Sequence, residues 1–558
     1  MNIKNIEKQK KNKINAIAQN ELNKEHFVTL LPWICLVAAY LAAVLFQLIF
    51  GEQLLNSDMS GEIILANKLN EGDGFVLSRS WYYSTELRVL YQHLTLQLGL
   101  LIFPHNWHLA RTISQAIMLA IYAACYLFLA HECNLKKIGV ISAAILMCPF
   151  GFWYMWYGTY NGAYLTPMLF VCFDLAMILH ISKNEKHRLF FIVLLLILSF
   201  MEGLNGVRML MNFYVPMTVA AVIIIFICIQ KKPLEKPFSK NSRLWLIKTT
   251  IFATVSCAAG YLVNAKVLAQ SYYFYTYEAP YWRQFEFSNL LDAWSMFLRI
   301  FGYPYHENWT MSDTWTENYL FSVTGILGSL GLGLMLAVIF SALRLLFQRD
   351  KLSFAHFTVL IAFWSCFIID SIVYSCLEDA ESMNSSYWLP IVPLAIAVVA
   401  IEIKTEHFRI PALRRTVIAV ILACAFCAGV STSYRFLKFP PRTIAGLEEV
   451  GEWLVENGWT KGYASFWAGD MLTELTDGEV EVWVVTDVAS LTIYPVLQST
   501  SHDTAPEGKV FVLFQYDDSM PYYSYDNLLY IDENGWVILG YDSADQLYEI
   551  MEQSSEDV

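Results

Sequence analysis

The sequence predicts an α-helical membrane protein with about eleven transmembrane helices and a small α/β domain at its C-terminal end. Three observations support this fold class. Hydrophobic residues make up 56% of the 558 residues and charged residues only 16%, whereas soluble domains carry about 25% charged residues. Long apolar runs recur up to residue 434. The remainder, 435–558, is acidic and of mixed polarity.

Apolar runs of about 17–25 residues are long enough to cross a bilayer as helices. The first run follows a polar segment, 1–28, and lacks a small-residue cleavage site, so we interpret it as a membrane helix and not as a signal peptide. The third and fifth runs are short. The runs lie at 29–50, 109–131, 138–152, 163–181, 189–204, 209–230, 245–267, 319–343, 354–376, 387–403 and 416–434.

The distribution of positive charge predicts the orientation. If the spans alternate from a cytoplasmic N-terminus, 24 of the 37 Lys and Arg residues fall in cytoplasmic segments, and 8 fall in outer segments before residue 435. Cytoplasmic loops generally carry such an excess. We therefore expect a multi-pass protein of the cell membrane, with a cytoplasmic segment 1–28, a membrane domain 29–434, and long outer loops at 51–108 and 268–318.

Residues 435–558 form a separate, extracytoplasmic domain in this interpretation. They contain 23 acidic and 5 basic residues, so their net charge is −18 although the whole chain carries −13. An odd number of spans places them outside the cell. Their apolar patterns predict helices at 446–456, 469–476 and 543–552, and strands at 462–466, 480–485, 510–515 and 536–541. This alternation is typical of a small α/β domain.

Several function classes find no support in the sequence. None of the 11 cysteines lies in 435–558 or in an outer loop, so we interpret them as buried apolar residues. No phosphate-binding loop, dinucleotide fingerprint or HExxH motif is present. Basic residues are confined to the membrane edges, which argues against a nucleic-acid partner.

The first outer loop carries the strongest candidates for chemistry. Asp58 follows the first span at the water–lipid boundary, where a carboxylate could act as a general base on an acceptor hydroxyl or bind a divalent metal. Glu62 lies four residues later and shares a helical face with Asp58. The alternative is that Ser57 or Asp58 caps that helix. Both interpretations remain open.

Three arginines, Arg88, Arg111 and Arg208, lie in outer segments against the general charge bias. Such residues often hold an anion, and a lipid phosphate is available at this depth. Alternatively, they pair with Glu86 or Glu202. Asp174 and Asp370 are isolated within spans, and we interpret them as structural.

The outer loop 268–318 is rich in Tyr and Trp. These residues could form an aromatic belt at the membrane interface. They could also form a platform for a sugar whose hydroxyl groups would bond Glu307, Asp313 or Glu317. Both interpretations remain open.

The basic N-terminus, the single span and the outer loop that opens on Ser57-Asp58 resemble the GT-C superfamily of membrane glycosyltransferases. The resemblance is greatest to bacterial relatives of protein O-mannosyltransferases and aminoarabinose transferases, a family-39-like group. Segments 387–393 and 462–475 are similar to motifs of those proteins. The sequence departs from them because no adjacent Asp-Glu pair is present, and because Glu378, Asp379 and Glu381 stand where a late arginine is usual.

The resemblance implies an inverting transferase that moves a sugar from a polyprenyl-phosphate carrier to a hydroxyl of a glycan, lipid or protein acceptor on the outer face. A divalent metal at Asp58 would be its only cofactor. The alternatives are a transporter or lipid flippase, and an inactive GT-C scaffold. The implied residues are Asp58 and Glu62 for catalysis, Arg88, Arg111 and Arg208 for the carrier phosphate, and Tyr83, Glu86, His93, Glu202 and Tyr387 for acceptor or sugar binding.

Overall fold

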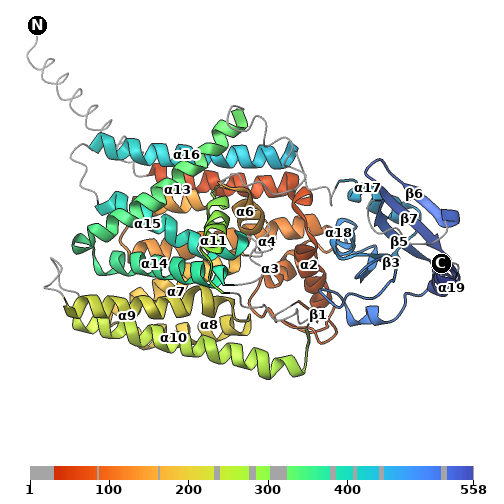
Figure 1. Cartoon of the computed structure of the whole chain (residues 1–558), viewed down its shortest axis with the longest axis horizontal. Helices are drawn as coiled ribbons and strands as arrows, with labels where there is room; N and C mark the ends of the chain where they lie inside the picture. Colours follow the sequence, from red (N-terminus) through yellow and green to blue (C-terminus); the bar gives the residue numbers. More distant parts are fainter. Residues whose placement is uncertain are drawn as a thin grey trace, which may run out of the picture.

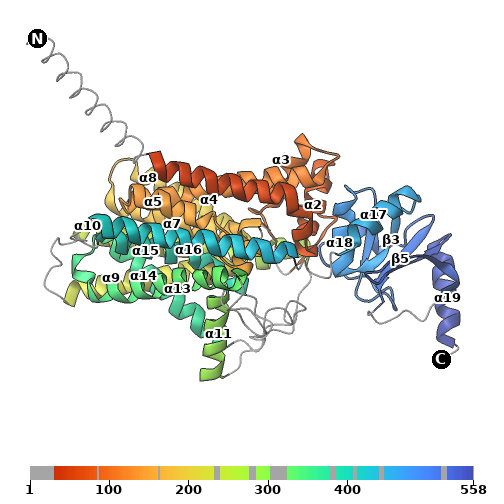
Figure 2. The same ribbon diagram turned by 90° about the horizontal axis from the view of Figure 1, so that it is seen from above.

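A bundle of long helices lies beside a small sheet domain that the C-terminal residues form (Figures 1 and 2). The helix α2 (Ser57–Asn70) lies where the two parts meet. The computed structural model describes residues 30–84, 87–160, 162, 164–230, 239–274, 284–301, 323–376, 385–405, 411–438, 445–516 and 525–556.

Nine helices in the described part are long and apolar enough to cross a membrane, and they coincide with nine of the predicted runs. The protein is therefore a multi-pass membrane protein. The helices are Leu30–Leu54, α4 (Trp107–Glu132), α7 (Leu165–Lys183), α9 (Val215–Gln230) with the preceding η3 (Leu210–Tyr214), α10 (Lys240–Lys266), α13 (Val323–Phe347), α14 (Phe354–Ser375), α15 (Val392–Thr405) with the preceding η6 (Ser385–Ile391), and α16 (Pro411–Lys438).

The two remaining predicted runs form shorter helices. The fifth run is α8 (Arg188–Leu204), which packs along α10. The third run is broken: α5 (Lys137–Leu146) ends before Pro149, and the chain continues through α6 (Phe152–Tyr154) and the π-helical η2 (Met155–Tyr160). Proline has no amide hydrogen and interrupts a helix. The broken run contacts α4, α7, α15 and η6, so its irregular backbone is enclosed by protein, as a membrane interior requires.

The outer end of the bundle is built from short elements. These are η1 (Gly51–Leu54), α2, β1 (Tyr82–Tyr83), α3 (His93–Ile102), η4 (Leu268–Gln270), β2 (Tyr273–Phe274), which pairs in parallel with β1, and α11 (Phe287–Arg299). The N-cap of α2 is Asn56, whose side-chain oxygen accepts a hydrogen bond from the Met59 amide at 3.0 Å. The prediction that Ser57 or Asp58 caps this helix is therefore wrong, and the Asp58 carboxyl is left for another role.

The C-terminal domain has the predicted α/β architecture. Its sheet has the strand order β4-β3-β5-β7-β6, in which β3 is parallel to β4 and β5 while β7 is antiparallel to β5 and β6. The sequence analysis missed β6. The elements are α17 (Leu447–Glu456), β3 (Lys461–Ser465), α18 (Phe466–Leu475), β4 (Glu481–Val485), η7 (Thr500–Asp503), β5 (Val510–Gln515), η8 (Tyr525–Asn527), β6 (Leu528–Ile531), β7 (Trp536–Tyr541) and α19 (Ala544–Glu556).

Direct hydrogen bonds join this domain to the outer end of the bundle. Arg111 on α4 donates to both carboxylate oxygens of Glu474 on α18, at 2.5 and 2.7 Å, and both residues are almost fully buried. The Ser57 hydroxyl donates to the Phe466 carbonyl at 2.5 Å. The main chain of Tyr82 also exchanges two hydrogen bonds with residues 497 and 498. The domain is therefore bonded to both α2 and α4.

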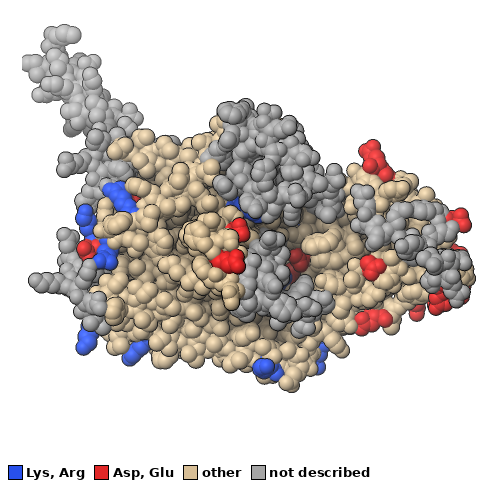
Figure 3. Space-filling model, in the orientation of Figure 1, with Lys and Arg blue, Asp and Glu red and all other residues tan. Residues whose placement is uncertain are grey.

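The surface charge agrees with the predicted orientation. On the face shown in Figure 3, Lys and Arg lie mainly at the end of the bundle farthest from the C-terminal domain, and Asp and Glu are spread over that domain. The orientation in the membrane stays a prediction, and it requires the C-terminal domain to lie outside the cell.

The buried Arg111–Glu474 pair gives a test of how the domain is attached. Removing one partner of a buried ion pair costs about 3–5 kcal/mol because the other charge stays buried without compensation. We expect Glu474→Gln to lower the thermal unfolding temperature of the purified protein strongly. The control is Glu185→Gln, which removes an exposed partner of Arg188 at 3.9 Å and should cost less than about 1 kcal/mol. Equal effects of the two substitutions would contradict the structural role of the pair.

Candidate active site

The Asp58 carboxyl lies in the first turn of α2, close to three charged side chains. It is partly exposed, and it accepts no hydrogen bond from any residue that the structure describes. Burial raises its pKa above the ordinary 3.8, Arg88 and Arg208 act in the opposite direction, and Glu62 adds to the increase. The carboxylate of Asp58 is therefore more basic than that of a free aspartate, and it is available to accept a proton.

Glu62, one turn further along α2, has a different environment. Its side chain is buried, Arg88 Nη1 lies 2.5 Å from Oε1, and His93 Nδ1 lies 3.7 Å from Oε2. Burial alone would raise the pKa of Glu62, but Arg88 and His93 outweigh that effect and lower it. Glu62 is therefore held as a carboxylate that orients Arg88.

A small cleft of about 30 Å³ opens beside these residues. Arg88 and Arg208 both line it. The guanidinium of Arg88 lies 4.6 Å from the ring centre of Tyr91, and that of Arg208 lies 4.7 Å from Tyr164 and 5.5 Å from Tyr387. Such cation–π contacts orient a guanidinium group. The cleft therefore presents two guanidinium groups, that of Arg88 also paired with Glu62, whose N–H donors suit a phosphate group.

Asn205 holds the segment that carries Arg88. Its side-chain oxygen accepts hydrogen bonds from the amides of Val89 and Leu90 at 2.7 and 2.8 Å, and its side-chain nitrogen donates to the Leu90 carbonyl at 2.9 Å. Asn205, Tyr91 and Tyr164 were not predicted from the sequence as site residues. A signal existed only for Asn205: it precedes Gly206, which has a φ of 102° and ends the turn after α8.

The structure brings together most of the predicted site residues. The charges of Asp58 and Glu62 on α2 interact with Arg88, and His93 lies close to Glu62. Arg88, Glu202 and Arg208 line the cleft, and Tyr387 packs against Arg208. These residues come from segments that are far apart in the sequence. They meet at the outer end of the bundle, beside the C-terminal domain.

Two predicted residues have other partners, and a third lies outside the described residues. Arg111 does not line this cleft: it is bonded to Glu474, and it also donates to the Met59 carbonyl at 3.0 Å. Its Nε and Nη2 atoms are therefore occupied, and its Nη1 is buried away from the cleft, which does not fit a role in binding the carrier phosphate. Tyr83 is buried against Tyr272 and Phe274, with its hydroxyl bonded to residue 78, and it belongs to the local core. Glu86 lies outside the described residues.

Asp174 is not isolated, contrary to the sequence analysis. The Tyr214 hydroxyl oxygen lies 2.8 Å from an oxygen of Asp174 and 2.8 Å from an oxygen of Glu202. The Ser199 hydroxyl oxygen lies 2.9 Å from the same tyrosine oxygen, so four side chains meet at this point. This buried group holds α7, α8 and η3 together beneath the cleft.

Much of the aromatic outer loop lies outside the residues that the structure describes. Residues 275–283 and 302–322 lie outside the described part, and so do Glu307, Asp313 and Glu317, as well as residues 377–384 with Glu378, Asp379 and Glu381. Of the described tyrosines, Tyr273 packs its ring 5.4 Å from that of Tyr82. Neither the belt nor the sugar platform is therefore tested.

The opposite pKa shifts of Asp58 and Glu62 predict opposite effects on stability. Because the folded state raises the pKa of Asp58, its contribution to stability is greatest below pH 3.8 and is lost as the pH rises through the folded-state value. Glu62 contributes above its ordinary 4.5, and that contribution is lost as the pH falls through its lowered value. At pH 7, thermal unfolding should therefore occur at a higher temperature in Asp58→Asn and at a lower one in Glu62→Gln. Shifts of the same sign would refute this assignment.

Comparisons with known proteins identify the fold. No protein-family model matches the sequence, and no curated protein matches it. Among solved structures, the chain is similar to ArnT, the aminoarabinose transferase, from Cupriavidus metallidurans, both bound to undecaprenyl phosphate and in the apo state. Each has a TM-score of 0.52 and 10% sequence identity, over 90% of this chain and 97% of that chain. The oligosaccharyltransferase of Archaeoglobus fulgidus has a TM-score of 0.43 and 14% identity, over 86% of this chain and 67% of that chain. The chain therefore shares the fold of ArnT, a member of the group that the sequence resembles.

Proposed function

We propose that this protein is a membrane glycosyltransferase that moves a sugar from a polyprenyl-phosphate carrier to an acceptor hydroxyl on the outer face of the membrane. One observation carries the proposal: the Asp58 carboxyl, which accepts no hydrogen bond from the described residues, lies beside a cleft that presents the guanidinium groups of Arg88 and Arg208. The GT-C fold supports the reaction class. A structural neighbour solved with undecaprenyl phosphate supports a polyprenyl-phosphate carrier.

In the proposed reaction, Asp58 is the general base. Its carboxylate takes the proton of the acceptor hydroxyl while that oxygen forms a bond to the anomeric carbon of the sugar. The bond between this carbon and the phosphate oxygen breaks, and the electron pair leaves with the carrier phosphate. Attack from the side opposite the phosphate inverts the anomeric centre. General-base assistance of this kind contributes about 10²–10⁴-fold in rate.

Arg88 and Arg208 would stabilise the departing phosphate. Negative charge grows on the phosphate as the bond breaks, and fixed positive groups in a poorly hydrated cleft stabilise such charge more strongly than water does. Glu62 would hold Arg88 in place through the 2.5 Å ion pair. Tyr164 and Tyr387, which flank Arg208, would orient its guanidinium in the same way.

The described residues around Asp58 do not form a metal site. No group of three or more His, Cys, Asp or Glu side chains in the described part is close enough to hold an ion. The charges nearest to Asp58 include two arginines, which would repel a cation. The proposed mechanism therefore has no step through a metal.

Asp58→Asn tests the general base. We expect it to reduce transfer at least about 10²-fold, because an amide cannot take the acceptor proton. Purified protein would be incubated with radiolabelled polyprenyl-phosphate sugars and envelope extract as acceptor, with and without divalent metal. Glu456→Gln, an exposed carboxyl on α17, is the control and should retain activity. Transfer by Asp58→Asn at the rate of the unaltered protein would exclude the assignment. No transfer by the unaltered protein would favour the transporter or the inactive scaffold.

Arg208→Gln tests the phosphate site. Loss of one charged donor to a developing anion typically costs about 10²–10³-fold in kcat, and we expect a loss of that size together with weaker retention of undecaprenyl phosphate. Arg208→Lys should recover part of the binding, since it keeps the charge but loses the planar fork of donors. If Arg208→Gln bound the lipid and transferred sugar normally, the carrier phosphate would have to lie elsewhere.

A further inference from the structure

A second cavity lies between α2 and the C-terminal domain, separate from the cleft of Arg88 and Arg208. Its volume is about 280 Å³, near the lower end of the range of about 300–1,000 Å³ for small-molecule sites. Residues of α2, including Asn67 and Lys68, line it from one side, and Asp470, Thr473 and Gln498 line it from the C-terminal domain. We propose that this cavity binds a neutral sugar unit of a glycan acceptor, a proposal that rests on the transferase function above.

Two buried polar atoms in the cavity wall lack hydrogen-bond partners among the described residues. They are Oδ2 of Asp470, whose side chain is 2% exposed, and Nε1 of Trp81, which is 1% exposed. Leaving a buried polar atom without a partner costs about 1–3 kcal/mol. Native proteins seldom retain this cost without a reason. An acceptor and a donor on the same cavity wall match the hydroxyl groups of a sugar, which can both donate and accept.

The walls also supply the apolar surface that a sugar requires. Trp81 and Trp107 line the cavity from the membrane side, and both are almost fully buried. The two rings stand behind the cavity surface and make this side of the wall apolar, whereas most of the other lining residues are polar. A sugar, with C–H groups on its faces and hydroxyl groups around its edge, matches such a mixed wall.

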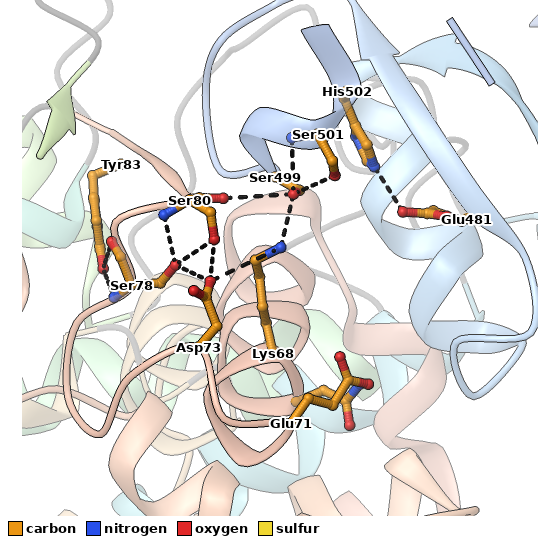
Figure 4. Close-up of polar contacts among 11 residues, drawn as sticks. Lys68, Glu71, Asp73, Ser78, Ser80, Tyr83, Glu481, Ser499, Ser501 and His502 are labelled. Carbon is orange, nitrogen blue, oxygen red and sulfur yellow. Dashed lines mark hydrogen bonds and ion pairs between the residues drawn. The ribbon is translucent and has the colours of Figure 1, made fainter. Parts of the chain in front are cut away.

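The polar rim is built from groups already bonded to one another, as Figure 4 shows. Lys68 Nζ donates to the Ser499 hydroxyl at 2.8 Å and lies 4.0 Å from Asp73. Across the rim, His502 Nε2 lies 3.0 Å from Glu481. These bonds hold the rim in place, so the cavity is preformed on both sides.

The charge of the lining indicates that the ligand is not an anion. The basic side chains of the lining, Lys68 and His502, are bonded within the rim, whereas the carboxyl groups of Glu71 and Glu481 line the cavity together with that of Asp470. Burial raises the pKa of Asp470 well above its ordinary value, and the neighbouring carboxyls of Asp58 and Glu474 raise it further. A carboxyl that keeps its proton can both donate to and accept from a sugar hydroxyl. Phosphate and uronic-acid groups would meet repulsion here.

The cavity is also close to the proposed base. The charges of Asp58 and Asp470 interact, and a Cβ atom on Gly61 of α2 would lie 3.4 Å from Asp470 Oδ2. A glycan with one sugar in this cavity would therefore extend along the same helix that carries Asp58. The C-terminal domain would in this way supply half of the acceptor site.

The test is a binding measurement that requires no transfer. The full-length protein in lipid nanodiscs would be applied to an array of neutral, sialylated, sulfated and amino-sugar glycans. We expect binding to neutral glycans and a loss of at least about tenfold in Asp470→Leu, which has a similar size but no hydrogen-bonding group. Because this substitution removes an unpartnered buried carboxyl, the thermal unfolding temperature should stay equal or rise. Asp545→Leu, the same change at an exposed position of α19, should bind as the unaltered protein does.

Each result of the glycan-binding measurement either supports or overturns the proposed acceptor cavity. No binding to neutral glycans, a preference for sialylated or sulfated glycans, or unchanged binding in Asp470→Leu would overturn the proposal. The array contains no sugar donor, so its result is independent of catalysis. If glycan binding requires Asp470 while Asp58→Asn still transfers normally, only the proposed mechanism fails. If Asp58→Asn is inactive while no glycan binds, only the acceptor cavity fails.

Discussion

The arrangement around α2 depends on the cost of burying carboxyl groups away from water. Two of them, Glu62 and Glu474, lie against arginines at 2.5 Å, and each of these arginines comes from a distant segment of the chain. The other two, Asp58 and Asp470, have no such partner and have raised pKa values. Paired carboxyls are locked in place, whereas unpaired ones keep oxygen atoms that other groups can reach or replace. Under the proposed function, α2 therefore carries one structural acid, Glu62, and one reactive acid, Asp58.

The distribution of the arginines follows from the same constraint. Glu474 occupies Arg111, so Arg111 attaches the C-terminal domain and does not line the cleft. Arg88 is shared between Glu62 and the cleft, and Arg208 packs against the rings of Tyr164 and Tyr387. Two guanidinium groups with different neighbours thus face one cleft.

The sequence predicted those features of the fold that depend on local patterns of apolar and polar residues. Apolar length identified the nine long helices, and alternation identified the sheet domain, apart from β6, whose LLYI segment lacks a clear period. Arg88 and Arg208 could be selected because they break the charge bias of outer loops. The role of Arg111 could not be predicted, since its partner lies 363 positions away. The sequence did not identify Asn56 as the N-cap of α2, because Ser57 and Asp58, which are also residue types that often cap helices, follow it directly.

The position of α18 has a consequence for how the two parts of the chain act. Both Asp470 and Glu474 lie on the helix that packs against α2, so the contact that attaches the C-terminal domain also forms the wall of its cavity. Under the proposed function, a separately moving domain could not keep an acceptor in register with Asp58. The bonds of Arg111 and of the Tyr82 main chain restrict such movement. The entropy of positioning the acceptor site would then be lost once, on folding, and not at each encounter with an acceptor.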